Sequence, residues 1–379
     1  MANVSSSNGI EKYPKLRFPE FTEPWKKIKI GDIYAERSER GSETSELLSV
    51  TMNDGVKRRS ELEGKDNSSE DKGNYKVVCT GDMVYNSMRM WQGANGISPY
   101  NGIVSPAYTV LTAKCDISNG FFAALFKTHK LISEFCKHSQ GMTSDTWNLK
   151  YPQIESIKTY IPSVAEQQKI AALIEKVDKR IAIQKELIDS LKKYKRGLLQ
   201  AVFNQKIRLT KSEENWQIYR IGDLLKICHG KDYKNISSQQ KTYPVLGTGG
   251  VIDYVDEYIC NWPCVLIGRK GTINKPQYME TPFWSVDTLF YSKPNKNQHP
   301  KFQFYLFQTI NWQKYNEASG VPSLSSSTIE GIKVNVPNYE TQAEINNIFS
   351  FVDCRIESTE KSLNNLLLLK KALLQQLFI

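Results

Sequence analysis

Two stretches of the chain repeat apolar residues at alternating intervals of three and four, which is the spacing of a helix that packs along a long seam. The first stretch is 165–203 and the second is 338–379. The seam positions are Ile174, Val177, Ile181, Ile188, Leu191, Leu198, Phe349, Val352, Ile356, Leu363, Leu366 and Leu373. Each position of the first helix recurs in the second at an offset of 175 residues. Both apolar stripes must be removed from water, so we expect the two helices to pack on each other.

A lysine interrupts each seam at the same place and indicates the direction of packing. A parallel pair in matching register would set Lys195 beside Lys370, where like charges repel. An antiparallel pair places each lysine against an isoleucine of the other helix, Ile356 or Ile181, so that its stem packs while its ammonium group reaches water. We therefore predict antiparallel helices, each on the order of 60 Å long at roughly 1.5 Å per residue, that act as a rigid spacer.

Shorter motifs recur as well and show that the chain consists of two copies of one repeated unit. The lead-in Lys15–Phe18, Trp25 and Ile30–Asp32 reappears at an offset of 191 as Lys206–Leu209, Trp216 and Ile221–Asp223. The segment Ile154–Pro162 returns as Ile329–Pro337, at the offset of 175 that the helices also have. Each repeated unit thus consists of a lead-in, a globular part and a long helix. The globular part of the first unit is longer than that of the second by 16 residues.

The two globular parts follow one plan in different residues. The first predicts a strand at Met83–Tyr85, a polar Gly-rich loop at 86–101, a strand at Ala107–Leu111, a helix at Phe121–Phe135 and a loop at Gly141–Ser144. The second predicts a strand at Pro263–Ile267, a loop at 268–275, a strand at Ser285–Tyr291, a helix at Phe302–Tyr315 and a loop at Gly320–Ser323. A common frame with unlike loops favours two different binding surfaces, although loops also diverge freely after a duplication.

These patterns predict an α+β fold with two similar globular domains separated by two long antiparallel coiled-coil helices, related by an internal pseudo-twofold repeat. The predicted boundaries are an N-terminal lead-in at 1–24, a first globular domain at 25–162, a first long helix at 163–205, a lead-in and second globular domain at 206–337, and a second long helix at 338–379.

Composition narrows the class of protein. A net charge of +10 is compatible with a polyanionic partner, but the basic run Lys192–Arg196 is equally explained as a solvated face of the first helix. Seven scattered cysteines argue against a disulfide framework. Cys260 and Cys264 have metal-like spacing, yet no second ligand pair accompanies them, which favours free buried thiols. The N-terminus has no apolar signal segment and no apolar run could cross a bilayer, so we expect a cytoplasmic protein.

Catalytic motifs are incomplete throughout. Ser105–Tyr108 approaches the amine-binding loop of a methyltransferase but lacks the accompanying Gly-rich cofactor turn. Asp54 with Glu61–Lys65 has the residue types of a magnesium nuclease but reads as a solvated loop. Gly247–Gly250 is not followed by the Lys-Ser/Thr of a phosphate loop. A fused methyltransferase-nuclease is therefore disfavoured, and we expect a protein that is not an enzyme.

The repeated motifs resemble those of the specificity subunits of type I restriction-modification enzymes, over nearly the whole chain. The resemblance rests on the lead-ins, the Pro-x-x-x-x-Q-x-x-I helix starts (Pro162, Gln167, Ile170 and Pro337, Gln342, Ile345), the helical Asp178–Ile181 with Asp353–Ile356, and the tail Lys370–Phe378. It implies that the globular parts are target recognition domains, each reading one half of a bipartite double-stranded DNA sequence. It also implies that the helices fix the gap between the halves and dock two methyltransferase (modification) subunits, with motor-nuclease (restriction) subunits in the full complex. S-adenosylmethionine, ATP and magnesium would bind those partners, and no cofactor or metal would bind this chain.

Candidate DNA-binding residues are the basic and amide side chains of the variable loops, because lysine and arginine contact phosphates while forked or amide groups match base edges. In the first domain they are Arg37, Arg40, Lys57, Arg58, Arg59, Asn86, Arg89, Gln92, Asn95, Thr143 and Ser144. In the second they are Lys231, Tyr233, Lys234, Arg269, Lys270, Thr272, Asn274, Lys275, Ser323 and Ser325. The rival hypothesis is a coiled-coil protein-interaction scaffold without a DNA role, from which salt-sensitive binding to duplex DNA would distinguish it.

Overall fold

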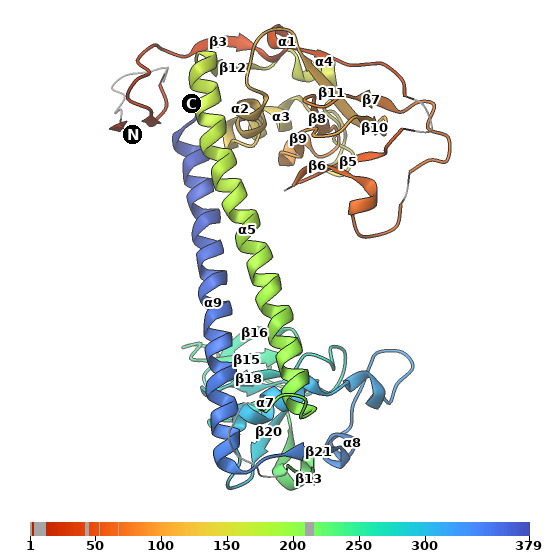
Figure 1. The fold of residues 1–379 in the computed structure, drawn as a ribbon, viewed down its shortest axis with the longest axis vertical. Helices are drawn as coiled ribbons and strands as arrows, with labels where there is room; N and C mark the ends of the chain where they lie inside the picture. The colour runs from red at the N-terminus through yellow and green to blue at the C-terminus, as the bar shows by residue number, and fades with distance from the viewer. Residues whose placement is uncertain (1, 4–12, 42–44, 53, 67, 209–215) are drawn as a thin grey trace. The chain divides into compact units, whose positions relative to one another are not determined.

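The computed structural model describes residues 2–3, 13–41, 45–52, 54–66, 68–208 and 216–379, and Leu209 of the second lead-in lies outside them. The chain divides into two compact units. Unit 1 consists of residues 1–185 and 362–379, and unit 2 consists of residues 186–361. The two long helices, α5 (Val164–Phe203) and α9 (Tyr339–Gln376), therefore each contribute to both units (Figure 1).

Unit 1 is built on a four-stranded antiparallel sheet in the order β4-β11-β8-β9. Its strands are β1 (Ala2–Asn3), β2 (Leu16–Arg17), β3 (Lys26–Lys29), β4 (Tyr34–Glu36), β5 (Leu48–Thr51), β6 (Gly55–Arg58), β7 (Lys76–Val78), β8 (Met83–Asn86), β9 (Asn95–Ile97), β10 (Gly102–Val104), β11 (Tyr108–Ala113) and β12 (Lys158–Ile161). Its short helices are α1 (Ile30–Ile33), α2 (Asn119–Leu125), α3 (His129–His138) and α4 (Tyr151–Ile154), with 3-10 turns η1 (Arg59–Glu61) and η2 (Met90–Gln92). The aromatic residues of α2 and α3 cover one face of this sheet and form its core.

Unit 2 has a corresponding antiparallel sheet in the order β14-β20-β17-β18, and a second sheet in the order β16-β15-β19. Its strands are β13 (Gln217–Arg220), β14 (Leu225–His229), β15 (Tyr243–Gly247), β16 (Gly250–Val255), β17 (Cys264–Gly268), β18 (Gln277–Met279), β19 (Trp284–Ser285), β20 (Leu289–Pro294) and β21 (Lys333–Val336). Its helices are α6 (Ile221–Leu224), α7 (Pro300–Thr309) and α8 (Ser326–Gly331), with a 3-10 turn η3 (Trp312–Tyr315). The predicted α+β class and the two-part repeat are confirmed.

Three predicted elements are shorter than the sequence indicated. The strand predicted at 285–291 is two strands, because Leu289 donates its N–H to the carbonyl of Val286 and accepts a hydrogen bond from the Ser285 hydroxyl, which closes a turn. The helix predicted at 121–135 breaks into α2 and α3, where Thr128 caps α3 by accepting the N–H of Leu131. The helix predicted at 302–315 is α7 followed by the separate turn η3.

A glutamine of the recurring motif makes equivalent hydrogen bonds at the start of the long helix in each unit. Gln167, almost fully buried, donates to the carbonyl of Pro162 at 3.0 Å and accepts the N–H of Ser118 at 3.1 Å. Gln342 in unit 2 donates to the carbonyl of Pro337 at 3.0 Å and accepts the N–H of His299 at 3.2 Å. One amide side chain thus ties the start of each long helix to the globular part, since buried amides need both kinds of partner.

The predicted antiparallel packing of the helices is confirmed inside each unit. In unit 1, Lys370 of α9 forms an ion pair with Asp178 of α5 at 2.5 Å. In unit 2, Lys195 forms the corresponding pair with Asp353 at 2.6 Å, and Lys192 pairs with Glu360. All the seam positions are buried or half-buried. The seam lysines were predicted to lie against isoleucines, and the structure pairs each of them with an aspartate of the other helix.

An aromatic cluster of the same composition joins a helix end to each unit. In unit 1, the ring of Phe378 lies 5.2 Å from Phe121 and 6.4 Å from Trp25 between ring centroids. In unit 2, the ring of Phe203 lies 5.3 Å from Phe302 and 5.8 Å from Trp216. Phe203 is the last residue of α5, and Phe378 follows the end of α9 by two residues, so each globular core is completed by the C-terminal end of a long helix that starts in the other unit.

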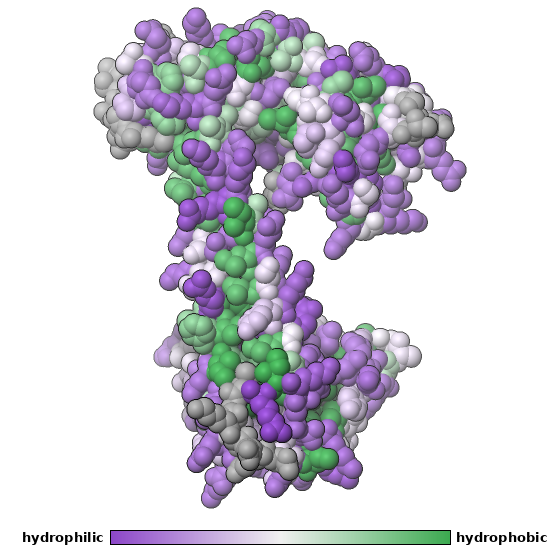
Figure 2. Space-filling model, in the orientation of Figure 1, coloured by the Kyte–Doolittle hydropathy of each residue, from purple (hydrophilic) through white to green (hydrophobic). Residues whose placement is uncertain are grey.

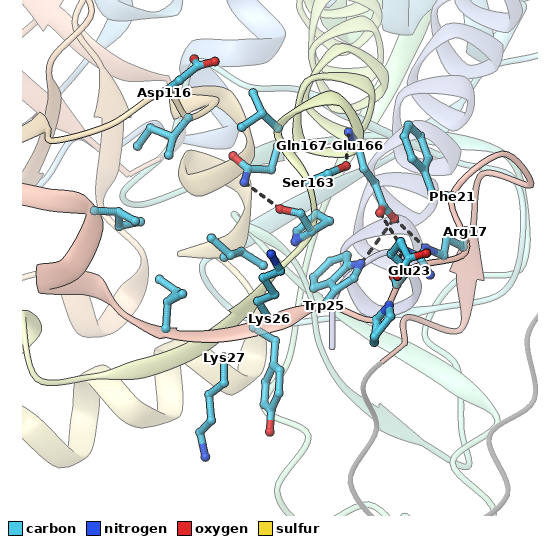
Figure 3. Close-up of a pocket in the computed structure, with 18 of the residues that line it drawn as sticks. Arg17, Phe21, Glu23, Trp25, Lys26, Lys27, Asp116, Ser163, Glu166 and Gln167 are labelled. Carbon is cyan, nitrogen blue, oxygen red and sulfur yellow. Dashed lines mark hydrogen bonds and ion pairs between the residues drawn. The ribbon is translucent and has the colours of Figure 1, made fainter.

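A buried ion pair distinguishes unit 1. The guanidinium of Arg17 donates from both Nε and Nη2 to the carboxylate of Glu166, at 2.8 and 2.7 Å, and the indole of Trp25 points at the same carboxylate (Figure 3). The side chains of Arg17 and Glu166 are only 5% and 1% exposed. They line one wall of a cavity of about 770 Å³ beside β3 and the start of α5. Such a pair strongly constrains its surroundings, because losing one partner leaves the other charge buried.

We expect Glu166→Ala to destabilise unit 1 by about 3–5 kcal/mol, the usual cost of removing one member of a buried ion pair. Hydrogen exchange of the amides in β3, β12 and α2 measures this locally, so that unit 2 serves as an internal reference. Glu175→Ala on the same helix is the control, because its pair with Lys179 is exposed and contributes about 0.5 kcal/mol or less. Equal effects of Glu166→Ala and Glu175→Ala on hydrogen exchange would show that the buried Arg17–Glu166 pair does not stabilise unit 1 more than an exposed pair does.

Candidate nucleic-acid interface

Each unit brings together two loops that are far apart in sequence. We call them the strand loop (86–95 in unit 1, 268–275 in unit 2) and the glycine loop (139–149 in unit 1, 316–325 in unit 2). In unit 2, the N–H of Gly271 donates to the carbonyl of Pro322 at 2.8 Å, and the N–H of Leu324 donates to the carbonyl of Arg269 at 2.9 Å. The two loops of unit 2 therefore form one continuous surface.

The loops of unit 1 meet in the same way through different contacts. The N–H of Leu149 donates to the carbonyl of Ser87 at 2.8 Å. The rings of Trp91 and Trp147 form an edge-to-face pair with centroids 5.3 Å apart. These contacts fix the glycine loop against the strand loop without using the polar side chains that the sequence analysis selected.

Glycine is required at one position in each pair of loops. Gly141 has a positive φ of 144°, and a Cβ there would lie 2.6 Å from the carbonyl oxygen of Thr146. A Cβ on Gly268, at the end of β17, would lie 2.4 Å from the carbonyl oxygen of Thr272. A side chain at either position would push the loop open, so these glycines set the loop geometry.

The loops of unit 2 collect seven of its predicted residues. They are Arg269, Lys270, Thr272, Asn274, Lys275, Ser323 and Ser325. Lys270, Asn274 and Lys275 are exposed, whereas Arg269 and Ser323 are half-buried. Ser325 has a structural task, because it caps α8 and its hydroxyl donates to the carboxylate of Glu317 at 2.8 Å. Hydrogen bonds from Thr328 and Ser325 hold the pKa of Glu317 below its ordinary value, so this anchor is ionised near neutral pH.

In unit 1, a cleft of about 420 Å³ gathers basic and amide groups. Its lining includes Asn86 and Arg89 of the strand loop together with Arg59 and Lys65. Lys65 was not among the predicted residues, although it ends the run Glu61–Lys65 that was considered as a nuclease motif and set aside. Asp66 also lines the cleft and lies 3.6 Å from Arg59, so among the described residues Arg89 and Lys65 supply its unpaired positive charge, which suits a phosphate or an electronegative base edge.

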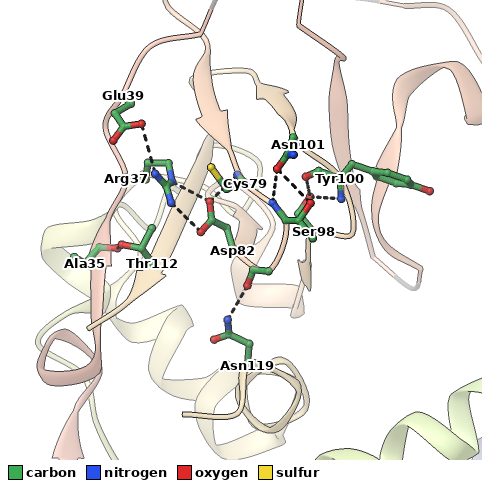
Figure 4. Close-up of polar contacts among 12 residues, drawn as sticks. Ala35, Arg37, Glu39, Cys79, Asp82, Ser98, Tyr100, Asn101, Thr112 and Asn119 are labelled. Carbon is green, nitrogen blue, oxygen red and sulfur yellow. Dashed lines mark hydrogen bonds and ion pairs between the residues drawn. The ribbon is translucent and has the colours of Figure 1, made fainter. Parts of the chain in front are cut away.

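Several predicted arginines of unit 1 are held by protein partners. Arg37 donates to the carboxylate of Asp82 at 2.9 and 3.2 Å, and Glu39 lies at its other side (Figure 4). Arg40 donates to the carbonyl of Asn74, and the guanidinium of Arg58 lies 4.5 Å from the centroid of the Tyr100 ring. Arg59 donates to the carbonyls of Leu62, Gly64 and Lys65. These guanidinium groups order the loops, and a DNA contact by Arg37 would compete with its ion pair.

The remaining predicted DNA-binding residues of unit 1 differ in how far their side chains are exposed to solvent. Asn95 is fully buried, and its amide donates to the carbonyl of Gly93, so it is not available to a base edge in this conformation. Gln92, Thr143 and Ser144 are exposed, and Lys57 is half-buried on β6.

A third loop of unit 2 carries Lys231, Tyr233 and Lys234. Lys231 and Lys234 are exposed, whereas Tyr233 packs against the hydrophobic core. The carboxylate of Asp256 holds this loop by accepting the hydroxyl of Ser237 and the N–H groups of residues 239, 240 and 241, at 2.6 to 2.9 Å. These donors keep the pKa of Asp256 below its ordinary value.

Two apolar residues at the tips of the glycine loops were missed by sequence reasoning. Met142 is 101% exposed and Val321 is 67% exposed, and each directly follows the loop glycine. Candidate DNA-binding residues that are chosen for charge or hydrogen-bonding groups do not include apolar residues. Their equivalent positions after Gly141 and Gly320 were the signal that could have identified them.

Exposed apolar residues also lie along the long helices. In unit 1 they are Ile183, Leu367, Leu368 and Leu369, and in unit 2 they are Leu187, Tyr194 and Phe351. Figure 2 shows hydrophobic side chains (green) at the surface of the helices, in contrast with the mostly hydrophilic surface (purple) of the globular parts. These residues lie outside the seam positions, so they add uncovered apolar surface to the helices.

Within the described residues, no three His, Cys, Asp or Glu side chains are grouped to hold a metal ion. No helix in that part of the chain has the length and apolar character that crossing a membrane requires.

The fold and the paired loops define a duplicated recognition protein, in which one structural plan presents two unlike surfaces. A family model described as the type I restriction modification DNA specificity domain matches residues 22–193 and again residues 213–368. Since these matches cover most of the sequence, the chain belongs to the type I restriction-modification specificity-subunit family.

Individual relatives agree with this assignment. The chain is 27% identical over 157 residues to the type I restriction enzyme MjaVIII specificity subunit of Methanocaldococcus jannaschii, covering 38% of this chain and 36% of that protein. It is 22% identical over 191 residues to the EcoprrI specificity subunit of Escherichia coli, covering 44% of this chain and 48% of that protein. Each match thus spans less than half of the relative. The crystal structure of a type I restriction-modification S subunit from M. genitalium has a TM-score of 0.64 at 17% identity, covering 97% of this chain and 99% of that one, which shows a common fold.

We expect the loop that carries Lys231 and Lys234 to loosen in acid. A carboxylate with a lowered folded-state pKa stabilises its loop above its ordinary pKa near 3.8, and that contribution is lost as the pH falls through the lowered value. Asp256→Asn should produce the loosened loop at neutral pH. Amide hydrogen exchange of residues 237–241 measures both effects, and Asp253→Asn is the control, because within the described part of the chain Asp253 accepts only the N–H of the neighbouring Tyr254 and does not hold this loop. If Asp256→Asn leaves the protection of these amides from exchange unchanged, the Asp256 carboxylate does not hold the loop.

Proposed function

We propose that this chain is the DNA sequence-specificity subunit of a type I restriction-modification complex, with one half of a bipartite duplex target recognised by each unit. The observation that carries the proposal is the pair of apposed loops, which has one plan and different residues in the two units. A half-site reader needs a constant frame and a variable contact surface, and the loops supply that variation. Membership of the specificity-subunit family supports the same conclusion.

Recognition would combine phosphate and base contacts. In unit 2, exposed Lys270 and Lys275 suit phosphate oxygens, while Arg269 and Asn274 have the forked and amide groups that match base edges. In unit 1, Arg89 and Asn86 take the corresponding roles from the strand loop, and Lys65 lines the same cleft. Residues held in ion pairs, such as Arg37, would shape the loops instead.

The long helices would dock two methyltransferase subunits. The uncovered apolar residues of α5 and α9 favour a protein partner, because exposed apolar rows are otherwise costly in water. Each unit presents part of this surface, which fits one partner for each half-site. Methyl transfer and DNA cleavage would be performed by the partner subunits with their own S-adenosylmethionine, ATP and magnesium, while this chain supplies no catalytic group.

A protein-interaction scaffold remains the alternative function. The same uncovered helix faces favour it, since they predict protein partners with or without DNA. Binding to duplex DNA that weakens steeply with added salt would support the specificity subunit. Binding to protein partners without any affinity for DNA would support the scaffold.

Arg89→Ala and Arg269→Ala form a matched test of the proposal. Each should weaken binding by about 1–3 kcal/mol if its guanidinium reads a base, because a bidentate base contact is lost. Each should also relax sequence preference in its own half-site only. The measurement is selection of bound duplexes from a randomised pool by the complex assembled with modification subunits.

The two variants are controls for each other, and Lys333→Ala, an exposed basic residue on β21, tests for a nonspecific charge effect. Equal relaxation of both halves by either arginine variant would contradict the assignment of one half-site to each unit. An unchanged preference would remove that arginine from the base readers.

The apolar loop tips would add contacts to thymine methyl groups. Met142 and Val321 project from braced loops beside polar candidates, and the 5-methyl group of thymine is the apolar feature of the major groove. Each contact removes about one methyl-sized apolar surface from water, which contributes about 0.8 kcal/mol.

Replacing thymine by uracil in the target should therefore weaken binding of the wild-type complex about fourfold at one position in each half. Met142→Ala should abolish that difference in the first half, and Val321→Ala should abolish it in the second. Equilibrium binding to substituted duplexes measures this. Ile252→Ala, which removes an exposed apolar side chain from β16, should leave both differences intact. A wild-type complex that binds both duplexes equally would rule out the contacts.

A further inference from the structure

Two thiols of unit 2 lie in contact with each other inside an apolar cluster. The sulfur atoms of Cys260 and Cys264 are 3.8 Å apart, and both residues are fully buried. They belong to an apolar cluster with Val245, Leu266 and Phe283. Since the described residues offer no group of three metal-binding side chains, a metal site does not account for the pair.

The two cysteines differ in how firmly the backbone holds them. Cys264 is the first residue of β17, which lies between β18 and β20 in the four-stranded sheet. Cys260 lies on the preceding loop, whose Asn261 and Pro263 are exposed on either side of Trp262. Its backbone pairs with Phe283 on one side only. The loop at Cys260 can therefore adjust more readily than the strand at Cys264.

The contact between the sulfurs makes their chemistry unequal. The hydrogen bond with Cys264 lowers the pKa of the Cys260 thiol, and the same contact raises the pKa of Cys264. Cys260 is thus the better nucleophile of the two, because the thiolate is the reactive form. Cys264 is placed to react with whatever group Cys260 acquires.

We propose that Cys260 and Cys264 form a reversible disulfide when the protein meets hydrogen peroxide. The Cys260 thiolate attacks one peroxide oxygen, giving a sulfenic acid and releasing hydroxide. The sulfur of Cys264 then attacks the sulfur of Cys260, the S–S bond forms, and the leaving hydroxide takes up the Cys264 proton as water. In total, two thiols and one peroxide give one disulfide and two waters. A small peroxide suits this site, because full burial excludes bulky disulfide oxidants.

The bond would act on segments that carry the candidate DNA-binding loops. A disulfide has an S–S length of about 2.05 Å, so the sulfurs must approach by roughly 1.8 Å. Strand β17 continues from Cys264 directly into Arg269. The segment paired with Cys260 continues into Trp284, whose indole donates to the carbonyl of Lys231 at 2.9 Å. Oxidation should therefore alter binding by unit 2, a consequence that rests on the proposed function.

The test treats the full-length chain with hydrogen peroxide, unfolds it, alkylates all free thiols with a maleimide, and measures the intact mass and the peptides. We expect five of the seven cysteines to be alkylated, a peptide linked through Cys260 and Cys264, and recovery of both thiols after reduction. Cys354→Ser, which removes an exposed thiol, should give the same linked peptide. In Cys264→Ser, Cys260 should stop at a sulfenic acid that a dimedone probe traps.

Other products would overturn the proposal. Free Cys260 and Cys264 at a peroxide dose that oxidises Cys354 would show that the pair is inert. Sulfinic acid at Cys260, or a bond from either residue to the nearby Cys228, would show that the geometry does not direct pairing. The wild-type result decides the matter even if a variant fails to fold.

The consequence for DNA is tested separately in the assembled complex. Oxidation should change binding to the second half-site severalfold and leave the first half-site unaffected, and Cys264→Ser should cancel the response. A disulfide without any change in binding would refute the coupling. A reduced complex that binds no DNA would instead refute the proposed function.

Discussion

The closure of each unit by an aromatic residue at the C-terminal end of a long helix is the contact on which the rest of the structure depends. Phe378 completes the aromatic core around Trp25, and Phe203 completes the corresponding core around Trp216. Phe203 is the last residue of α5 and Phe378 lies just after the end of α9, and each of these helices begins in the other unit. Because a buried aromatic side chain contributes several kcal/mol, neither repeat contains a complete core of its own. The antiparallel direction of the helices follows from this exchange, and the ion pairs of Lys195 and Lys370 reinforce it.

Because the long helices and the aromatic cores hold each unit together, the loops can differ in sequence between the two units. The joints at Gln167 and Gln342 are the same in both units, down to their backbone partners. The loops are instead braced by local means, a tryptophan pair and Gly141 in unit 1, and the carboxylate of Glu317 in unit 2. Since the braces of each unit lie within that unit, a change of surface in one unit need not disturb the other. That independence is what the recognition of two unrelated half-sites requires.

The sequence predicted most reliably those features that many residues determine together. The helix seams, summed over several turns, predicted both helices nearly to the residue, and the lysine in each seam predicted their antiparallel direction. Features that depend on one contact were not predictable, such as the turn at Val286 or the cap at Thr128. The carboxylate partners of the seam lysines depend on the helix register, which periodicity does not specify. In the candidate interface, residue type could not reveal that Asn95 is buried or that Arg37 is held by Asp82.

The Arg17–Glu166 pair shows how the two copies can diverge without losing the frame. At the corresponding positions of unit 2, Arg208 is exposed and Thr341 is buried. A buried arginine without its carboxylate would be strongly destabilising, so the loss of the acid and the exposure of the arginine belong together. Unit 2 thus lacks the buried Arg–Glu pair that constrains unit 1, and its frame keeps the aromatic cluster, the glutamine at the helix start and the Lys195–Asp353 pair. Both copies therefore retain apolar closure, one amide at the helix start and one lysine–aspartate pair between the helices.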